Sequence, residues 1–522
     1  MPQPWWRGAV FYQVYVRSFA DSNDDGIGDL PGITSRLEHV KDLGADALWL
    51  TPFYPSPQKD HGYDVADYVD VNPEYGTLDD FDRLLARAHE LRLKVLVDIV
   101  PNHTSDRHAW FQAAVSSPDS PFRERYHFAD PKPDGSPPNN WTSSFGGPAW
   151  SREPNGRQWY LHLFAPEQPD LNWWHPEVPK EFERILRFWL DRGADGFRID
   201  VASALFKRKD LADRPFIADR VTGEPRFDSA FAIVDQPQLH EVYQRWRRLA
   251  NAYEPDRVLV GEIFEPRRHS KYIVPDQLHM AFALIHQPWD AALWRRSIQV
   301  MQQALREPGA EPTWTLGNHD VVRPLTRLGG GATGRARTRA AMLLLLGLSG
   351  QVFIYQGEEL GLEEVDLPDE SRQDPVFFHS GGHRRGRDGC RVPLPWRRGA
   401  PNAGFSNADP WLPMPAGWDR LAVDAQAGEG ESTLALFRRA LAERARLRGR
   451  LPERIDWLPA PPGVLAYRRG SLAVACNFNA HTARLDFPGR LLLGSDPLVR
   501  SNHGCLSLPA NSAAWLSRVA RL

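Results

Sequence analysis

Short apolar runs rich in β-branched and aromatic residues recur along the chain, and helical patterns follow most of them. Strands that are apolar on both faces and alternate with helices are typical of a parallel sheet. Eight such runs predict an α/β fold, a (β/α)8 TIM barrel. An open doubly wound sheet is the alternative, but no glycine-rich phosphate loop follows the first run. The runs cover residues 10–19, 47–52, 94–100, 196–200, 258–263, 280–286, 312–320 and 351–359.

Two segments interrupt this alternation. Residues 104–175 are rich in Pro, Gly, Asn and Trp and are too long for a simple connection, so they predict a small ordered subdomain inserted after strand 3. From residue 449, short strand-like runs predict a C-terminal antiparallel β-domain. The expected organisation is therefore a barrel formed by residues 1–103 and 176–448, with the inserted subdomain at 104–175 and the C-terminal domain at 449–522.

Composition narrows the class of partner. The 522 residues carry a formal net charge of -3, which favours neither nucleic acid nor an anionic membrane surface. Three cysteines fit a reducing cytoplasm better than a disulfide framework. The N-terminus lacks a signal-peptide pattern, and the apolar run at 340–355 is too short to span a membrane. We expect a cytoplasmic protein whose partner is neither nucleic acid nor a membrane.

Three acids stand where predicted barrel strands end, which is where barrel enzymes carry their reactive groups. Asp200 follows the fourth strand, Glu262 the fifth and Asp320 the seventh. Each acid alone could be a helix cap. Together they match glycosidic bond cleavage, which needs one acid to protonate the leaving oxygen and one carboxylate to attack the anomeric carbon.

The neighbours of these acids suggest their roles. Arg198 lies two residues before Asp200 and therefore points to the same side of the strand. A guanidinium in that position should favour an ionised nucleophile at Asp200. Glu262 follows the apolar run "VLVG", a setting that favours the protonated form of a carboxyl group.

The segments "DIVPNH" (98–103), "GFRID" (196–200), "GEIFE" (261–265) and "GNHD" (317–320) resemble, in order and spacing, the signature regions of the α-amylase superfamily of retaining glycoside hydrolases. The resemblance covers essentially the whole chain. It implies that Asp200 is the nucleophile, Glu262 the general acid/base and Asp320 the stabiliser of the transition state. It also implies that three further residues bind the sugar in subsite -1: His103, Arg198 and His319.

Three other segments resemble the oligo-1,6-glucosidase and α-glucosidase branch of this superfamily: "QKDHGYDVADY" (58–68), "QPDLNWW" (168–174) and "GRDGCRVPLPW" (386–396). The likeness places Asp60 and Tyr63 around a terminal glucose and Arg391 beside Asp60. A pair between Asp60 and Arg391 would close the far side of subsite -1 and make the enzyme exo-acting. An ordinary surface salt bridge is the alternative.

The function implied by the resemblance is an exo-acting retaining α-glucosidase for α-1,4 or α-1,6 bonds of short oligosaccharides. Val201, directly after the nucleophile, resembles the residue of α-1,6-preferring enzymes, so a strict oligo-1,6-glucosidase is an alternative. A transferase or isomerase, such as a trehalose or isomaltulose synthase, would share the three acids. A catalytically dead scaffold would lack an intact acid set, which this chain retains.

The acidic stretch "DSNDDGIGD" (21–29) follows the first predicted strand. An EF-hand counted from Asp21 needs Glu at its twelfth position, which is Gly32 here. The alternating residues can still aim side-chain oxygens and one carbonyl at a single point, and a similar loop is a structural cation site in the same branch. We predict a structural Ca²⁺, or Mg²⁺, with an acidic turn as the alternative. The expected ligands are Asp21, Asn23, Asp25, Ile27 and Asp29.

Overall fold

Eight parallel strands close into a barrel, which confirms the predicted fold. The computed structural model describes residues 4–154, 156–218, 225–227, 233–263 and 266–517. Each of the eight apolar runs contains one barrel strand, and the observed strands are shorter because the runs also included the loop residues that follow. The barrel strands are β1 (Val10–Val14), β2 (Ala47–Leu50), β3 (Lys94–Ile99), β7 (Gly196–Ile199), β10 (Val258–Gly261), β11 (Met280–Leu284), β12 (Thr313–Thr315) and β13 (Gln351–Tyr355).

Amphipathic helices surround the barrel and turn their apolar residues toward it. In α4, for example, Phe182, Leu186 and Trp189 are buried at helical spacing. Local sequence fixes where helices start: Thr77 and Asp80 form a capping box at α2. The long helices are α1 (Leu30–Leu43), α2 (Leu78–Glu90), α4 (Glu177–Asp191), α5 (Leu239–Ala250), α7 (Ala291–Ala304), α9 (Gly331–Leu346) and α13 (Thr433–Leu447). Shorter ones are α6 (His269–Tyr272), α8 (Pro324–Arg327), α10 (Pro375–His379), α11 (Asp388–Arg391) and α12 (Val423–Ala427).

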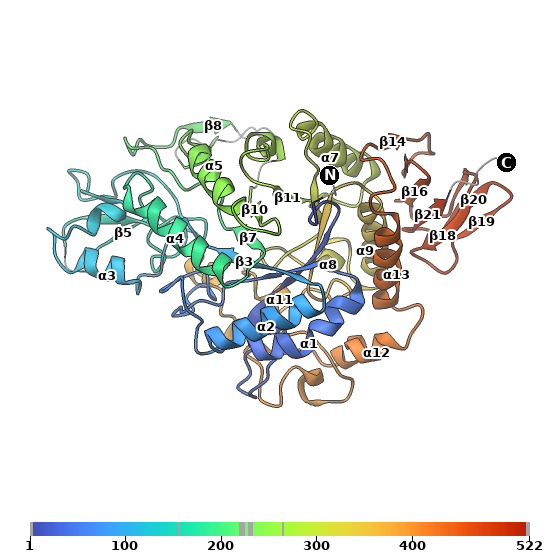
Figure 1. Ribbon diagram of the computed structural model, residues 1–522, viewed down its shortest axis with the longest axis horizontal. Coiled ribbons are helices and arrows are strands. Elements are labelled where there is room, and N and C mark those ends of the chain that lie inside the picture. Colours follow the sequence, from blue (N-terminus) through green and yellow to red (C-terminus); the bar gives the residue numbers. More distant parts are fainter. Residues whose placement is uncertain (1–3, 155, 219–224, 228–232, 264–265, 518–522) are drawn as a thin grey trace.

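The long segment between β3 and α4 contains α3 (Ala109–Val115) and a small antiparallel sheet in the order β4-β6-β5. Its strands are β4 (Phe128–Ala129), β6 (Trp159–Leu161) and β5 (Trp150–Arg152). Buried aromatic residues, including Trp141 and Trp150, give it a core of its own. Figure 1 places it at one end of the molecule, at the left of the view. A further hairpin, β8 (Phe216–Ala218) with β9 (Pro225–Phe227), follows β7.

Two antiparallel sheets form the C-terminal part, at the opposite end of Figure 1. Between this part and the barrel lies α9, whose residues from Thr338 to Leu346 are all buried. The phenol of Tyr467 donates to the carbonyl of Leu344 at 2.7 Å, and the indole of Trp515 donates to Leu343 at 2.8 Å. One sheet contains β14 (Asp456–Trp457), β15 (Val464–Arg469), β16 (Leu472–Asn477), β21 (Ala513–Ser517) and β18 (Arg490–Gly494), and the other contains β17 (Ala483–Asp486), β20 (Cys505–Leu508) and β19 (Arg500–Asn502).

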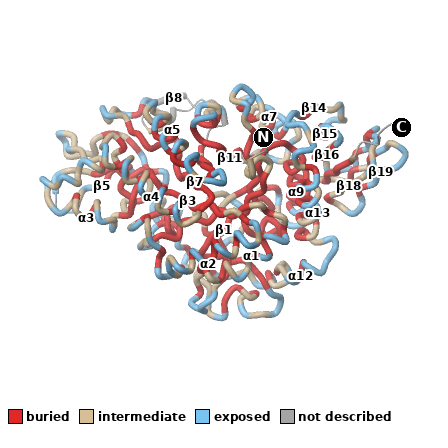
Figure 2. Tube along the Cα trace, viewed as in Figure 1, coloured by how far each residue is buried: buried red, intermediate tan, exposed pale blue. Residues whose placement is uncertain are grey.

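Apolar side chains fill the barrel interior, and Figure 2 shows burial concentrated along its strands. Phe11 and Phe353 stack there with ring centroids 4.4 Å apart, and Trp49 packs beside them. The interior is therefore a packed core, and ligands can approach the barrel only at its ends. Within the described ranges, no helix combines the length and the apolar character needed to cross a membrane.

Candidate active site

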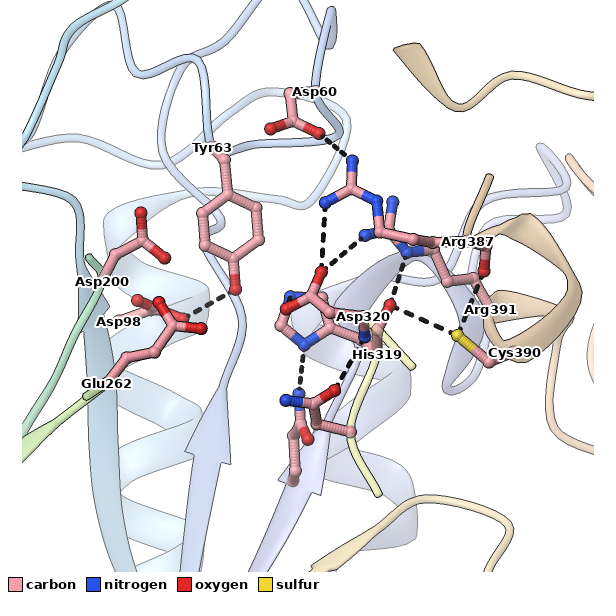
Figure 3. Close-up of polar contacts among 12 residues, drawn as sticks. Asp60, Tyr63, Asp98, Asp200, Glu262, His319, Asp320, Arg387, Cys390 and Arg391 are labelled. Carbon is pink, nitrogen blue, oxygen red and sulfur yellow. Dashed lines mark hydrogen bonds and ion pairs between the residues drawn. The ribbon is translucent and has the colours of Figure 1, made fainter. Parts of the chain in front are cut away.

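The three predicted catalytic acids lie together at the C-terminal ends of the barrel strands (Figure 3). Asp200 directly follows β7 and Glu262 directly follows β10, while Asp320 comes five residues after the end of β12. All three line one cavity of about 770 Å³. The barrel thus brings into one site three carboxyl groups that are far apart in the sequence.

Arg198, on β7 and 1% exposed, lies at the centre of this acid cluster. Its Nη1 is 2.6 Å from Asp200 Oδ1 and 3.0 Å from Asp98 Oδ1, and its Nη2 is 3.0 Å from Glu262 Oε1. The Tyr63 phenol donates to Asp98 Oδ2 at 2.9 Å. A single planar guanidinium therefore orients the carboxyl groups of Asp200 and Glu262 with respect to each other.

The expected effect of Arg198 on Asp200 is present, but burial outweighs it in the pKa of this acid. Burial raises the pKa of Asp200, and the neighbouring acids Glu262 and Asp98 raise it further, while Arg198 lowers it. Burial also raises the pKa of Asp98, to about 6, against the effect of Arg198. Arg198 therefore opposes the effect of burial at both Asp98 and Asp200, and its positive charge favours their ionised forms.

The pKa of Asp320 is shifted in the opposite direction, below its ordinary value. Burial raises its pKa, but His319, Arg387 and Arg391 outweigh burial and hold the pKa below its ordinary value. Arg387 Nη1 and Arg391 Nη2 each lie 3.1 Å from Asp320 Oδ1. The site therefore combines one acid whose pKa is lowered, Asp320, with two whose pKa values are raised by burial, Asp98 and Asp200.

Val201 fixes Glu262 from the other side. Its backbone N–H donates to Glu262 Oε2 at 3.0 Å, and its side chain lines the cavity. Its φ of 46° lies in the left-handed region, which a β-branched residue rarely adopts. Such strain costs about 1 to 3 kcal/mol and is found mainly at functional sites.

Asp60 lies in the cavity wall, 4% exposed, but its partner is not the predicted one. The guanidinium paired with Asp60 belongs to Arg387, with Nη2 2.6 Å from Asp60 Oδ1. The expected pair with Arg391 is wrong: Arg391 contacts Asp320, and its Nε donates to the carbonyl of His319 at 2.9 Å. The two arginines are one helical turn apart, so both point toward the site.

The two predicted sugar-binding histidines line the same cavity. Burial lowers the pKa of His103 to about 4 and that of His319 well below its ordinary value, so both rings are neutral near pH 7. The amide of Gln13 lies 2.7 Å from Nδ1 of His319, which leaves Nε2 as the protonated nitrogen facing Asp320. Tyr63 stacks on His319 with ring planes 7° apart.

Several residues of the site were not among those predicted. Gln168 is fully buried and donates through Nε2 to Asp60 Oδ2 at 3.0 Å, and it lies within the motif "QPDLNWW". Arg387 lies four residues before Arg391, so the i, i+4 spacing in "GRDGCR" was the available signal. Asp98 stands at a strand end like the three predicted catalytic acids. The apolar part of the wall includes Phe145, Phe164 and Val376.

The acidic loop lies apart from this cavity and is held by its own hydrogen bonds. Asp21 Oδ1 accepts from the backbone N–H of Asn23 at 3.0 Å, and Asp25 Oδ1 accepts from that of Ile27 at 2.8 Å. Asp29 Oδ1 accepts from Gly32 N at 2.6 Å and caps α1. In the part of the chain that the structure describes, no group of three or more His, Cys, Asp or Glu residues is arranged to hold a metal ion.

Each loop carboxylate retains lone pairs beyond these bonds, and the alternating residues keep the oxygen chemistry that Ca²⁺ prefers. The hydrogen bonds alone also account for the loop as a series of Asx turns. The cation therefore stays a prediction.

Comparison with known proteins places the chain in a family. The model of the α-amylase catalytic domain matches residues 13–449. A probable α-glucosidase of Rhizobium meliloti is 42% identical over 492 residues, which cover 91% of this chain and 89% of that protein. The oligo-1,6-glucosidase of Heyndrickxia coagulans is 35% identical, with 94% and 96% covered.

Solved structures agree with this assignment. An α-glucosyl transfer enzyme is 40% identical and superposes with a TM-score of 0.91, covering 99% of this chain and 100% of its own. The trehalulose synthase of Pseudomonas mesoacidophila is 32% identical, with a TM-score of 0.88 and the same coverage. The chain belongs to the α-amylase family and is a glycoside hydrolase of that family.

Proposed function

We propose that the protein is an exo-acting retaining α-glucosidase that releases terminal glucose from short oligosaccharides. The observation that carries this proposal is the wall beside the acid cluster, where Asp60 is held between Arg387 and Gln168. Such a wall would end the binding site after one sugar and offer charged and amide groups to the hydroxyls of that sugar. The probable α-glucosidase and oligo-1,6-glucosidase relatives support the same activity.

In the proposed reaction, the Asp200 carboxylate attacks the anomeric carbon while Glu262 gives its proton to the leaving glycosidic oxygen. The C–O bond to the leaving sugar breaks as an ester bond to Asp200 forms. A water molecule then gives a proton to Glu262 and attacks the same carbon, which frees Asp200 with the configuration retained. Asp320, ionised and held by two arginines, stabilises the positive charge that develops on the sugar ring.

Val201 is the residue from which we propose a preferred glycosidic linkage. Val201 lines the cavity beside Asp200 and would narrow the space for a second sugar bound next to that acid. One contact of this size changes selectivity by about 1 to 3 kcal/mol. Because Val at this position resembles α-1,6-preferring enzymes, we expect a preference for α-1,6 bonds that does not exclude α-1,4 bonds. We therefore propose activity on both.

A transferase or isomerase is the second candidate, because the similar solved structures include a transfer enzyme and a trehalulose synthase. The apolar wall formed by Phe145, Phe164 and Val376 favours this candidate, since water competes poorly with a bound sugar in an apolar space. Both candidates use the same glucosyl-enzyme and differ in the molecule that accepts the glucose.

Kinetics on maltose, isomaltose, sucrose, trehalose and soluble starch, with product identification, test these proposals. We expect α-glucose as the first product, high turnover of disaccharides and little activity on starch. Starch as the preferred substrate would contradict the exo-acting site. Sucrose isomers or longer oligosaccharides as the main products at high substrate concentration would establish the second candidate.

A further inference from the structure

Asp374 is a fully buried acid just outside the cavity. Its Oδ1 accepts from Val376 N at 3.0 Å, so it caps the N-terminus of α10, and from Arg387 Nη2 at 2.9 Å. Its Oδ2 accepts from Arg387 Nε at 2.9 Å and from the backbone N–H of Arg387. One carboxylate therefore receives four N–H groups, three of them from Arg387.

This arrangement determines how Arg387 is oriented. Because Nε and Nη2 both donate to Asp374, the plane of the guanidinium is fixed as in a fork-to-fork carboxylate pair. The remaining donors then point away from Asp374, Nη2 toward Asp60 at 2.6 Å and Nη1 toward Asp320 at 3.1 Å. Arg387, Asp60 and Asp320 line the cavity, whereas Asp374 lies behind Arg387.

Neighbouring residues support the contact between Asp374 and Arg387. Gly386 has a φ of 75°, and a Cβ added there would lie 2.9 Å from the Cβ of Asp374, so the turn that brings Arg387 onto the carboxylate needs glycine. The buried Asp388 accepts from the backbone N–H of Asp374 at 2.9 Å and of Gln373 at 2.7 Å. The backbone and the side chain of Asp374 are thus both held in place.

We infer that Asp374 is a positioning residue of the sugar-binding site, which acts through Arg387 to hold Asp60 and Asp320 in their working geometry. The inference deepens the proposed function, because it assigns the support of the wall that ends the site. Without Asp374, the Arg387 guanidinium could rotate toward Asp60 or toward Asp320. The groups that bind the terminal sugar and stabilise the transition state would then be displaced. Displacement of a binding group by about 1 Å can cost about 100-fold in rate.

Two substitutions separate positioning from helix capping. Asp374→Ser keeps a good capping oxygen for Val376 but cannot form the fork with Arg387. Asp374→Asn keeps the size of the side chain but turns an amide N–H₂ toward donors of Arg387. We expect each variant to lose about 10- to 100-fold in kcat/KM, with a raised KM. Asp366→Asn is the matched control, because Asp366 lies in the same segment and pairs with Arg372 and Arg385 at an exposed position.

A double-substitution cycle tests whether the effect passes through Arg387. Adding Asp374→Ser to Arg387→Ala should cost little beyond Arg387→Ala alone. Losses that multiply, or an Asp374→Ser variant with the kinetics of the natural chain, would overturn the inference. If the Asp374 variants do not fold, Arg387→Lys replaces them: lysine keeps the charge but not the fork, so kinetics like those of the natural chain would overturn it as well.

These measurements use whichever α-glucoside the natural chain cleaves best. The substrate panel then decides the proposed function, while the ratios between variants decide the role of Asp374.

Discussion

At the scale of single residues, Asp60 is the carboxylate that we propose ends the sugar-binding site. It accepts from Arg387 and Gln168 and is almost fully buried at the cavity wall. We expect Asp60→Ala to lose most activity, about 100-fold or more in kcat/KM, because a buried charge-assisted contact to the terminal sugar disappears. The protein should stay folded, since Arg387 keeps its fork with Asp374. Steady-state kinetics and thermal unfolding check this result.

Lys59→Ala is the control for Asp60→Ala, because Lys59 is the exposed neighbour of Asp60 in the sequence. It should change neither kinetics nor stability. Unchanged turnover of short α-glucosides by Asp60→Ala would rule out the wall as part of the sugar site.

The histidines of the site allow a prediction about pH. Burial lowers the pKa of His103 to about 4, below the unfolded value of about 6.5, so the folded chain keeps this ring neutral until the pH falls to about 4. The value of KM should therefore show no histidine step between pH 5 and 8. His103→Gln should raise KM while leaving the shape of the profile in this range unchanged. A step near pH 6.5 that disappears in His103→Gln would contradict this prediction.

The sequence predicts some of these residues and not others, for a physical reason. Asp200, Glu262 and Asp320 are placed by strand ends, and strands are visible as apolar runs. The local sequence does not distinguish Arg387 from Arg391 as the partner of Asp60, because the two are one helical turn apart and lie on the same side of it. Only the three-dimensional path of the segment before them decides which guanidinium reaches Asp60. The raised pKa values of Asp98 and Asp200 likewise depend on burial that no local pattern reports.

At the scale of elements, the acidic loop after β1 allows a test of the predicted structural cation. Its carboxylates accept backbone N–H groups within the loop, and Asp29 also caps α1. If the predicted Ca²⁺ binds, removing it should destabilise the protein by about 3 kcal/mol when the ion had been present at 100 times its dissociation constant. We expect EDTA to lower the Tm, added Ca²⁺ to restore it, and kcat to stay unchanged for the protein that remains folded.

A variant separates ion binding from the hydrogen bonds of the loop. Asp25→Asn keeps an oxygen acceptor for the N–H of Ile27 but removes a charge, so it should weaken the effect of EDTA with little loss of stability in EDTA itself. The same Tm with and without EDTA in the natural chain would identify the loop as an acidic turn.

Elements differ in how far the sequence predicts them. The barrel strands follow from apolar runs, and each predicted run contains one strand. The sequence did not predict the sheet inside the inserted segment. One of its strands, β4, has only two residues and pairs with β6 about thirty residues later. Pairing of such short strands depends on tertiary packing rather than on local preference.

At the scale of the whole molecule, α9 joins the barrel to the C-terminal sheets. Its run from Ala340 to Leu346 is buried throughout, so it needs apolar cover on more than one side. The C-terminal part supplies this cover through Tyr467 and Trp515, which also donate to carbonyls of the helix. The candidate active site lies at the loops that follow the barrel strands, and Tyr467 and Trp515 do not line its cavity. A substitution that weakens the contact between α9 and the C-terminal sheets should therefore lower stability without changing catalysis.

Trp515→Ala tests that separation. The side chain is fully buried against α9, and truncating a buried Trp costs about 3 to 5 kcal/mol through lost contacts and a new cavity, with the carbonyl of Leu343 losing its donor as well. We expect a Tm lower by several degrees and kcat/KM within about twofold of the natural chain at a temperature where the variant is folded. Leu498→Ala, at a position in the same domain that is 65% exposed, should leave both quantities unchanged. A large loss of kcat/KM in a folded Trp515→Ala protein would mean that the C-terminal sheets shape the sugar site through α9, and the two ends of the molecule could no longer be treated as independent.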